Sequence, residues 1–345
     1  MDNTTNNNIK KHQITIVTIN GYSNYGNRLQ LFALSRVLKM QGYSVHVYIP
    51  NAIYDKAKKL IKYKTIIKYI YLKQSRLYIF TQKHISKTLN DNNSQIEIYG
   101  SDQIWNPNYI KTSPYLLNTR SKAFKISYAA SIGKSELSNH EKRMFAESLR
   151  DFKFISTREL SAKKLLQPLT DKKIEVVLDP TLLLDKTEYS KLERKPRNIK
   201  PGENYVLCYI LGNRDYQEAI EKFAKEKRCK TIYFSDKRDS SYGVEEFLYL
   251  IHHAKLICTD SFHACVFSFI FERPFIAFRR TGESDYMYTR LENLIDTFKL
   301  KNREFNGKEI TKENLKVNYA EAKEILKKEQ KKSLNFLKKA LDIKE

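Results

Sequence analysis

Apolar runs rich in β-branched residues alternate with helix-patterned stretches over the first half of the chain. The run 14–19 (ITIVTI) stops at an Asn-Gly pair, and a polar loop leads into the helix-patterned stretch 28–43. The run 44–49 comes shortly after Gly42, a residue suited to the left-handed conformation that often follows the end of a helix. Strand, loop, helix and strand in this order predict an α/β unit.

The alternation continues, which predicts a mostly parallel sheet with helices between its strands. Further strands are predicted at 96–100, 124–130, 152–157 and 174–180, and helices around 139–150 and 159–167. The stretch 186–204 combines charge with Pro196, Pro201 and Gly202, which predicts a linker. Beyond it the pattern restarts, with strands at 205–211, 230–234, 255–259 and 274–278 and helices at 214–227, 244–253 and 262–272.

Two such series predict an α/β fold of two doubly wound, Rossmann-like domains that face a cleft. The active site is expected between them, at the carboxyl ends of the strands. The expected parts are a disordered tail over 1–13, an N-terminal domain over 14–185, the linker 186–204, a C-terminal domain over 205–311 and C-terminal helices over 312–345. No fixed-period repeat is visible, which argues against solenoids and propellers.

Composition adds a strong charge to this picture. The 345 residues include 62 Lys+Arg against 39 Asp+Glu, a formal net charge of +23. The charge favours an anionic partner: nucleic acid, anionic lipid or a phosphorylated substrate. The basic residues are scattered and no helix-turn-helix, RRM or zinc-finger signature is present, so nucleic acid is the least favoured.

The remaining composition points to an intracellular protein. Four cysteines without a C-x-x-C pair are typical of reduced thiols. The first residues lack the apolar segment of a signal peptide, and no uncharged run approaches the roughly 18 residues that span a bilayer. A cytoplasmic location is therefore expected.

The turn between the first strand and helix, NGYSNYGNRLQ, is the first candidate site. It matches neither G-x-G-x-x-G nor G-x-x-x-x-G-K-[ST], which disfavours NAD and Walker-type ATP binding. Unpaired N–H groups at a helix start favour an anion or a sugar hydroxyl, so Asn24, Tyr25, Gly26 and Asn27 are candidate binding residues. The alternative is an ordinary turn in which Asn27 is the N-cap and Gly26 a hinge.

A second candidate is YGSDQIWNP (99–107), where a predicted strand gives way to Ser101, Asp102 and Gln103. These side chains could hydrogen-bond a substrate, and Asp102 could accept a proton from an attacking hydroxyl. The alternative is that Asp102 caps the following turn. Trp105 is expected to pack in the core.

The stretch 258–278 (CTDSFHACVFSFIFERPFIAF) is the most informative. Asp260 and Ser261 lie where a strand gives way to an apolar helix, and either could be its N-cap, while His263 falls in the first turn. An imidazole at such a helix start could be catalytic or purely structural. Arg158, in STRE just after another predicted strand, could present its planar fork to a carboxylate or phosphate.

The stretch 53–73 interleaves Lys with Ile, Leu and Tyr at partly helical spacing. Such a basic amphipathic helix can lie in a lipid headgroup layer. A solvated helix packed on its own sheet explains the pattern as well.

Taken in order, GYSNYGNRLQLFAL, YGSDQIWNP, STRE, VVLDPTLLL and the 258–278 stretch resemble the polysaccharide pyruvyl transferase family, over about residues 14–280. The resemblance implies a glycosyltransferase-B-like fold with an acceptor side in the N-terminal domain and a donor side in the C-terminal domain. It implies a transferase that moves the enolpyruvyl unit of phosphoenolpyruvate onto a sugar diol, giving a pyruvate ketal and phosphate.

The resemblance also implies residue roles. Arg158 would bind the donor, and His263 would match the histidine of a short Arg-x-His motif that contacts phosphoenolpyruvate, with Ser261 in place of the arginine. His263 would be the general acid or hold the leaving phosphate, the helix start with Asp260 and Ser261 would bind the anion, and Asp102 is the candidate base. No metal and no cofactor beyond the donor substrate are expected.

The acceptor implied by such pathways is a lipid-diphosphate-linked saccharide for a cell-surface polysaccharide such as a capsule or exopolysaccharide. That would place the protein at the cytoplasmic face of the membrane. The alternative is a nucleotide-sugar-dependent glycosyltransferase of the same two-domain shape, because the fold does not fix the chemistry.

Overall fold

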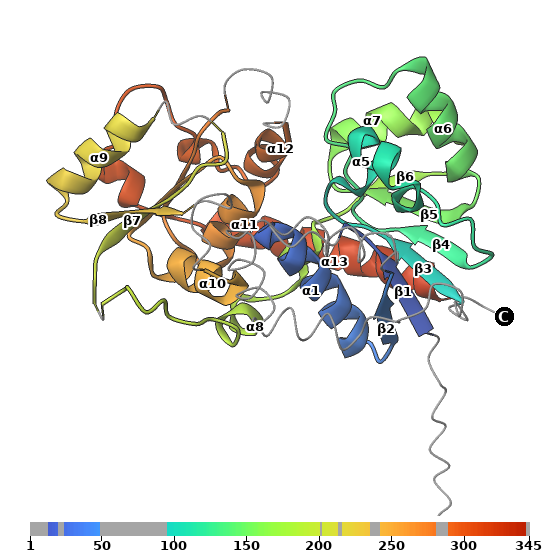
Figure 1. Ribbon diagram of the computed structural model, residues 1–345, viewed down its shortest axis with the longest axis horizontal. Helices are drawn as coiled ribbons and strands as arrows, with labels where there is room; N and C mark the ends of the chain where they lie inside the picture. Colours follow the sequence, from blue (N-terminus) through green and yellow to red (C-terminus); the bar gives the residue numbers. More distant parts are fainter. Residues whose placement is uncertain are drawn as a thin grey trace, which may run out of the picture.

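The computed structural model describes residues 13–19, 24–48, 95–200, 202–212, 216–234, 242–280 and 289–342. Two parallel sheets form the centres of two lobes (Figure 1). Three predicted features lie outside the described residues: the tail 1–13 except for Gln13, the first part of the turn that follows the first strand, and the basic stretch 53–73. No helix of the described part of the chain is both long and apolar enough to cross a membrane.

The first sheet has six parallel strands in the order β2-β1-β3-β4-β5-β6. The strands are β1 (Gln13–Val17), β2 (Ser44–Val47), β3 (Ile96–Tyr99), β4 (Phe124–Ser127), β5 (Phe152–Thr157) and β6 (Ile174–Val176). Its helices are α1 (Tyr25–Met40), α5 (Pro107–Thr112), α6 (Asn139–Leu149) and α7 (Leu160–Leu166). Because β1 and β3 are neighbours with β2 on the far side of β1, the chain direction across the sheet reverses at β1/β3, where a crevice opens in doubly wound folds.

The second sheet has four parallel strands in the order β10-β9-β7-β8. The strands are β7 (Tyr205–Tyr209), β8 (Lys230–Phe234), β9 (Leu256–Thr259) and β10 (Phe275–Ala277). Its helices are α9 (Gln217–Glu226), α10 (Val244–His253), α11 (Phe262–Ile270) and α12 (Thr289–Thr297). Cys208 and Cys258 face each other in register on β7 and β9, and all four cysteines are free.

The segment between the sheets and the chain end add further elements. The predicted linker holds α8 (Lys186–Ser190), and α13 (Ala320–Leu341) forms one long helix within the predicted C-terminal helices. Single 3-10 turns lie at Gln103–Trp105, Pro114–Leu116, Gln167–Leu169, Pro180–Leu183, Lys301–Arg303 and Lys312–Leu315.

Helices α1 and α13 each contact both lobes. α13 runs along both of them (Figure 1): Tyr319, just before its first residue, donates to the Arg273 carbonyl at 2.8 Å, and Ser333 accepts the Leu178 N–H at 2.9 Å. Tyr25 at the start of α1 stacks on Phe247 of the second lobe, with ring centroids 5.2 Å apart. One hydrophobic cluster accordingly runs through residues of both sheets. The domain boundaries stay a prediction.

The predicted strands and helices of the described residues are confirmed, with small shifts at their ends. Gly42 lies just past α1 with a φ of 87°, as predicted, and Trp105 is buried against Phe145 and Phe152. The alternative in which Asn27 is the N-cap of this helix is wrong. The helix begins one turn earlier, and the Asn24 side chain accepts the Asn27 N–H at 3.1 Å.

Candidate functional site

Three charged residues meet at the carboxyl edge of the first sheet. Asp102 follows β3, Arg158 follows β5 and Asp179 follows β6. Isolated bridges join Asp102 to Ala130 and Ala130 to Thr157, so the strand ends stay side by side beyond the regular ladder. Parallel strands thus bring together side chains that lie up to 77 positions apart in the sequence.

Asp179 is the centre of this cluster. Its Oδ2 accepts Arg158 Nη1 at 2.8 Å and Ser101 Oγ at 3.3 Å, while Oδ1 accepts the Thr181 N–H at 3.0 Å. Burial alone would raise the pKa of Asp179, but His263 and Arg158 outweigh it and hold that pKa well below its ordinary value. Asp179 is therefore an anion at neutral pH.

Asp102 is held in the same way by weaker contacts. Its carboxylate accepts Asn27 Nδ2 at 3.3 Å and lies 3.8 Å from a nitrogen of Arg158 and from one of Arg290. Burial opposes ionisation, but Arg158, His263 and Arg290 together lower the pKa of Asp102 below its ordinary value. The predicted alternative of a turn cap is not seen, since Asp102 makes no side-chain cap bond in the described structure. A carboxylate of such low pKa is a weak base at neutral pH.

His263 approaches this edge from the other lobe, in the first turn of α11. Its Nε2 lies 3.7 Å from Asp179 Oδ2 and has no hydrogen-bond partner among the described residues, although the side chain is only 7% exposed. The ring occupies the place of a side chain at Gly26, where a Cβ would lie 2.0 Å from His263 Nδ1. Gly26 therefore provides the space for the imidazole, in place of the predicted hinge.

The start of α11 offers N–H groups. Ser261 is its N-cap residue but makes no side-chain cap bond to the described helix. The Asp260 carboxylate instead accepts the N–H groups of Leu211 and Gly212 at 2.8 and 2.7 Å and Arg280 Nε at 2.9 Å. Asp260 thus has a full set of protein partners, and its contact with a donor stays a prediction.

The remaining residues predicted to bind the acceptor differ in burial and in their hydrogen-bond partners. Tyr25 is 1% exposed and donates its hydroxyl to the Tyr242 carbonyl at 2.8 Å, so it packs in the core. Asn24 is exposed, and Ser101 is buried with its hydroxyl donated to the Ala129 carbonyl at 3.0 Å. Turning the amide of Gln103 places its oxygen 3.0 Å from both Nη atoms of Arg290.

Sequence reasoning missed two members of the cluster. Asp179 belongs to the VVLDPTLLL motif, and an Asp followed by Pro at a strand end was a signal that could have identified it. Arg290 comes from α12, in the amphipathic stretch TRLENL, where no local signal distinguishes it from a solvated arginine. Its side chain is only 10% exposed.

The two guanidiniums of the cluster differ in their surroundings. Although burial opposes its charge, the carboxylates of Glu159, Asp179 and Asp102 raise the pKa of Arg158 above its ordinary value. Burial and the neighbouring charge of Arg158 lower the pKa of Arg290 to about 10. Arg290 is thus a cation near another cation, an arrangement that an anion bound between them would stabilise.

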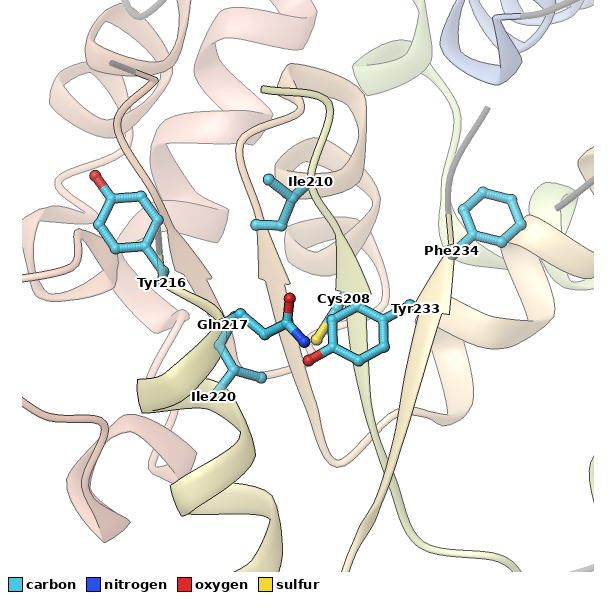
Figure 2. A pocket seen from close by; sticks show the side chains of 7 residues that line it. All are labelled: Cys208, Ile210, Tyr216, Gln217, Ile220, Tyr233 and Phe234. Carbon is cyan, nitrogen blue, oxygen red and sulfur yellow. The ribbon is translucent and has the colours of Figure 1, made fainter. Parts of the chain in front are cut away.

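A cleft of about 300 Å³ opens beside this cluster, a size suited to a small ligand. Arg158, Asp179 and Arg290 line it together with Phe262, whose ring lies 4.3 Å from the Arg158 guanidinium carbon. A second hollow in the other lobe holds only about 10 Å³ and is lined by Cys208, Ile210, Tyr216, Gln217, Ile220, Tyr233 and Phe234 (Figure 2). It has room for about one water and no charged lining residue.

Solved structures of similar shape are distant in sequence. An uncharacterised protein from Klebsiella pneumoniae is 12% identical, with a TM-score of 0.49 over 87% of this chain and 93% of that one. UDP-GlcNAc 2-epimerase from Methanocaldococcus jannaschii is 12% identical, with a TM-score of 0.45 over 91% of this chain and 98% of that one. A search of curated proteins found no match.

A family model gives the decisive comparison. The model described as polysaccharide pyruvyl transferase matches residues 24–282, which include Asp102, Arg158, Asp179 and His263 but not Arg290. The match covers most of the chain and agrees with the motifs and the α/β fold. The chain belongs to the polysaccharide pyruvyl transferase family.

Proposed function

We propose that this transferase moves the enolpyruvyl unit of phosphoenolpyruvate onto two neighbouring hydroxyls of a saccharide. The C2–O bond to phosphate breaks, the C2=C3 double bond becomes single as C3 gains a proton, and two C2–O bonds to the sugar form. The proton of one sugar hydroxyl restores the group that protonated C3. The proton of the other sugar hydroxyl leaves with phosphate. The observation that carries the proposal is His263 Nε2, a buried imidazole nitrogen without a hydrogen-bond partner in the described structure, 3.7 Å from Asp179 and beside an uncapped helix start.

His263 is the proposed proton donor to C3. The assignment rests on position. His263 Nε2 lies 3.7 Å from Asp179 Oδ2 and has no hydrogen-bond partner among the described residues, so this nitrogen can contact the substrate.

The anionic groups of the donor are proposed to bind Arg158, Arg290 and the N–H groups at the start of α11. Arg158 Nη2 has no hydrogen-bond partner among the described residues, and its side chain is 3% exposed. A guanidinium fork matches a carboxylate or a phosphate, and a helix start attracts either. Arg290 supplies a charge that Ser261 cannot.

Asp179 positions the two donor-binding groups because it contacts both Arg158 and His263. Asp102 and Asn27 lie at the β1/β3 crevice and are proposed to face the acceptor sugar. Asn24, Ser101 and Gln103 are proposed to support acceptor binding around them. Asp102 would orient an acceptor hydroxyl more than take its proton, because its pKa is low.

The proposed acceptor is a lipid-diphosphate-linked saccharide used for a cell-surface polysaccharide. The charge of +23 supports an anionic acceptor and contact with an anionic membrane surface from the cytoplasmic side. No further cofactor is proposed.

The test is a reaction of the purified protein with phosphoenolpyruvate and a panel of lipid-linked and free saccharides. Phosphate release, followed by phosphorus NMR, should accompany a pyruvate-ketal mass gain on the sugar. Parallel reactions replace phosphoenolpyruvate with UDP- or GDP-sugars. Activity with nucleotide sugars alone would overturn the proposal, and so would phosphate release without ketal formation across the whole panel.

A further inference from the structure

Two histidines and a glutamate meet at the end of α10, away from the cleft. His252 and His253 are the last residues of that helix, and Glu193 lies between α8 and β7, 59 positions before His252. Glu193 Oε1 lies 2.6 Å from His252 Nδ1, and Oε2 lies 3.1 Å from His253 Nε2. None of the three lines the cleft beside Asp179.

Both imidazoles are held in place by aromatic stacking. The His252 ring stacks on Phe271 at 4.3 Å with an interplanar angle of 12°, and the His253 ring stacks on Tyr249 at 4.1 Å and 26°. These contacts fix the ring planes while Nδ1 of one and Nε2 of the other point at the same carboxylate. Little side-chain freedom remains to be lost when a common ligand binds.

The ligand atoms suit a transition-metal ion. One carboxylate oxygen and the two imidazole nitrogens all lie within 4.8 Å of one another. Imidazole nitrogen and carboxylate oxygen are ordinary zinc ligands at about 2.0–2.2 Å, so the hydrogen-bonded groups need to move apart only slightly to admit an ion. The side chains of Glu193, His252 and His253 are 10%, 25% and 42% exposed, which leaves a path from solvent.

We propose that Glu193, His252 and His253 form a binding site for one divalent transition-metal ion, of which Zn²⁺ is the representative. The three side chains supply three ligands and water completes the coordination. Because Zn²⁺ binds the unprotonated imidazole, acidification should release it. The ion would tie the segment between the two sheets to the end of α10 and close a loop of about 60 residues, which stabilises the folded chain.

This site was not predicted from the sequence, where only the His-His pair is visible and Glu193 is one of many acidic residues. Its carboxylate lies within hydrogen-bond distance of both rings, which places it between the two ligand nitrogens.

The experiment measures Zn²⁺ binding to the full chain after removal of any affinity tag and treatment with EDTA. Calorimetry should give one equivalent bound, and Co²⁺ in its place should give the visible d–d bands of a low-coordinate site. Zn²⁺ should also raise the melting temperature. Failure of the wild-type protein to bind either ion overturns the proposal.

Variants locate the ion. His252→Ala and Glu193→Gln should lose both the bound equivalent of Zn²⁺ and the rise in melting temperature. His140 is an exposed histidine at the start of α6, so His140→Ala should keep both. Far-UV circular dichroism without metal checks that each variant folds. Binding that survives in both site variants, or that is lost equally in His140→Ala, would show adventitious binding and overturn the assignment.

Discussion

The carboxyl edges of the two parallel sheets contrast in what they bring together. At the first edge, Asp102, Arg158 and Asp179 come from neighbouring strands and form a buried charged cluster. At the second edge, the strand ends around β7 and β8 surround a hollow without charged lining residues (Figure 2), and Asp260, the acidic residue directly after β9, is bound by Arg280. Among the described residues, the two edges therefore differ in the side chains that their strand ends bring together.

The difference follows from what each lobe presents to the other. The first lobe holds its charges on rigid strand ends, and the second contributes His263 and Arg290 from the starts of helices. Hydrogen bonds through Asp179 fix Arg158, and Gly26 leaves the space for His263. The proposed reaction predicts that substitutions at the first edge, at His263 and at Arg290 alter turnover. Substitutions in the hollow of the second lobe should alter only stability.

The largest effect is expected for His263→Ala. Removing a general acid costs about 10²–10⁴-fold in rate. The variant should still fold cooperatively but with some loss of stability, because the buried imidazole helps to hold the Asp179 anion. Phosphate release measures the reaction rate, and thermal melting measures the folding transition. Wild-type turnover in a folded His263→Ala protein rejects the catalytic assignment.

Gly26→Ala should lower turnover by displacing the His263 imidazole from its position. The new methyl would lie about 2.0 Å from His263 Nδ1, so the ring must move, and a displacement near 1 Å can cost about 10²-fold in rate. Combining it with His263→Gly, which also removes the Cβ that would lie 2.7 Å from the new methyl, separates this effect from general damage. In that double variant Gly26→Ala should add little further loss, because the side chain it would displace is already absent. Additive losses would mean that Gly26 acts independently of His263.

Much of the fold was predictable because buried parallel strands appear as apolar runs. The strand 230–234 and the helix 244–253 were predicted with the bounds that the structure gives them. The start of α1 was missed because Tyr25 and Gly26 do not continue the apolar periodicity of the helix. Polar residues at strand ends could be found in the same way, which is how Asp102 and Arg158 were selected.

The rest of the site depends on long-range packing. Arg290 reaches Asp102 from a position 188 residues later, and nothing in its own helix marks that contact. Gly26 and His263 were selected separately, but no local pattern shows that one makes room for the other. Periodicity reports which face of an element is buried, and it cannot report which element lies against that face.

Arg290→Gln should weaken donor binding more than it slows the reaction. Losing a charged hydrogen bond to an anion costs about 1.5–3 kcal/mol, which corresponds to a rise in the KM for phosphoenolpyruvate of roughly 10–150-fold. Arg279→Gln is the matched control, because that arginine is 57% exposed and pairs with Glu292 at 3.1 Å. An unchanged KM in Arg290→Gln would contradict the donor-binding role and leave Arg158 as the principal cation.

The first edge should also make the stability of the protein depend on pH. The folded-state pKa of Asp179 lies below its unfolded value of about 3.9, so its stabilising contribution is complete above that value and is lost as the pH falls below it. Asp179→Asn should be less stable at pH 7 by about 3–5 kcal/mol, because Arg158 loses a buried partner. The difference from the wild type should shrink between about pH 4 and pH 2, as measured by denaturant unfolding. Asp296→Asn, at a residue with a side chain that is 65% exposed, should show neither change. A difference that stays constant through this range would mean that Asp179 stabilises the edge through its shape and hydrogen bonds, and not through its charge.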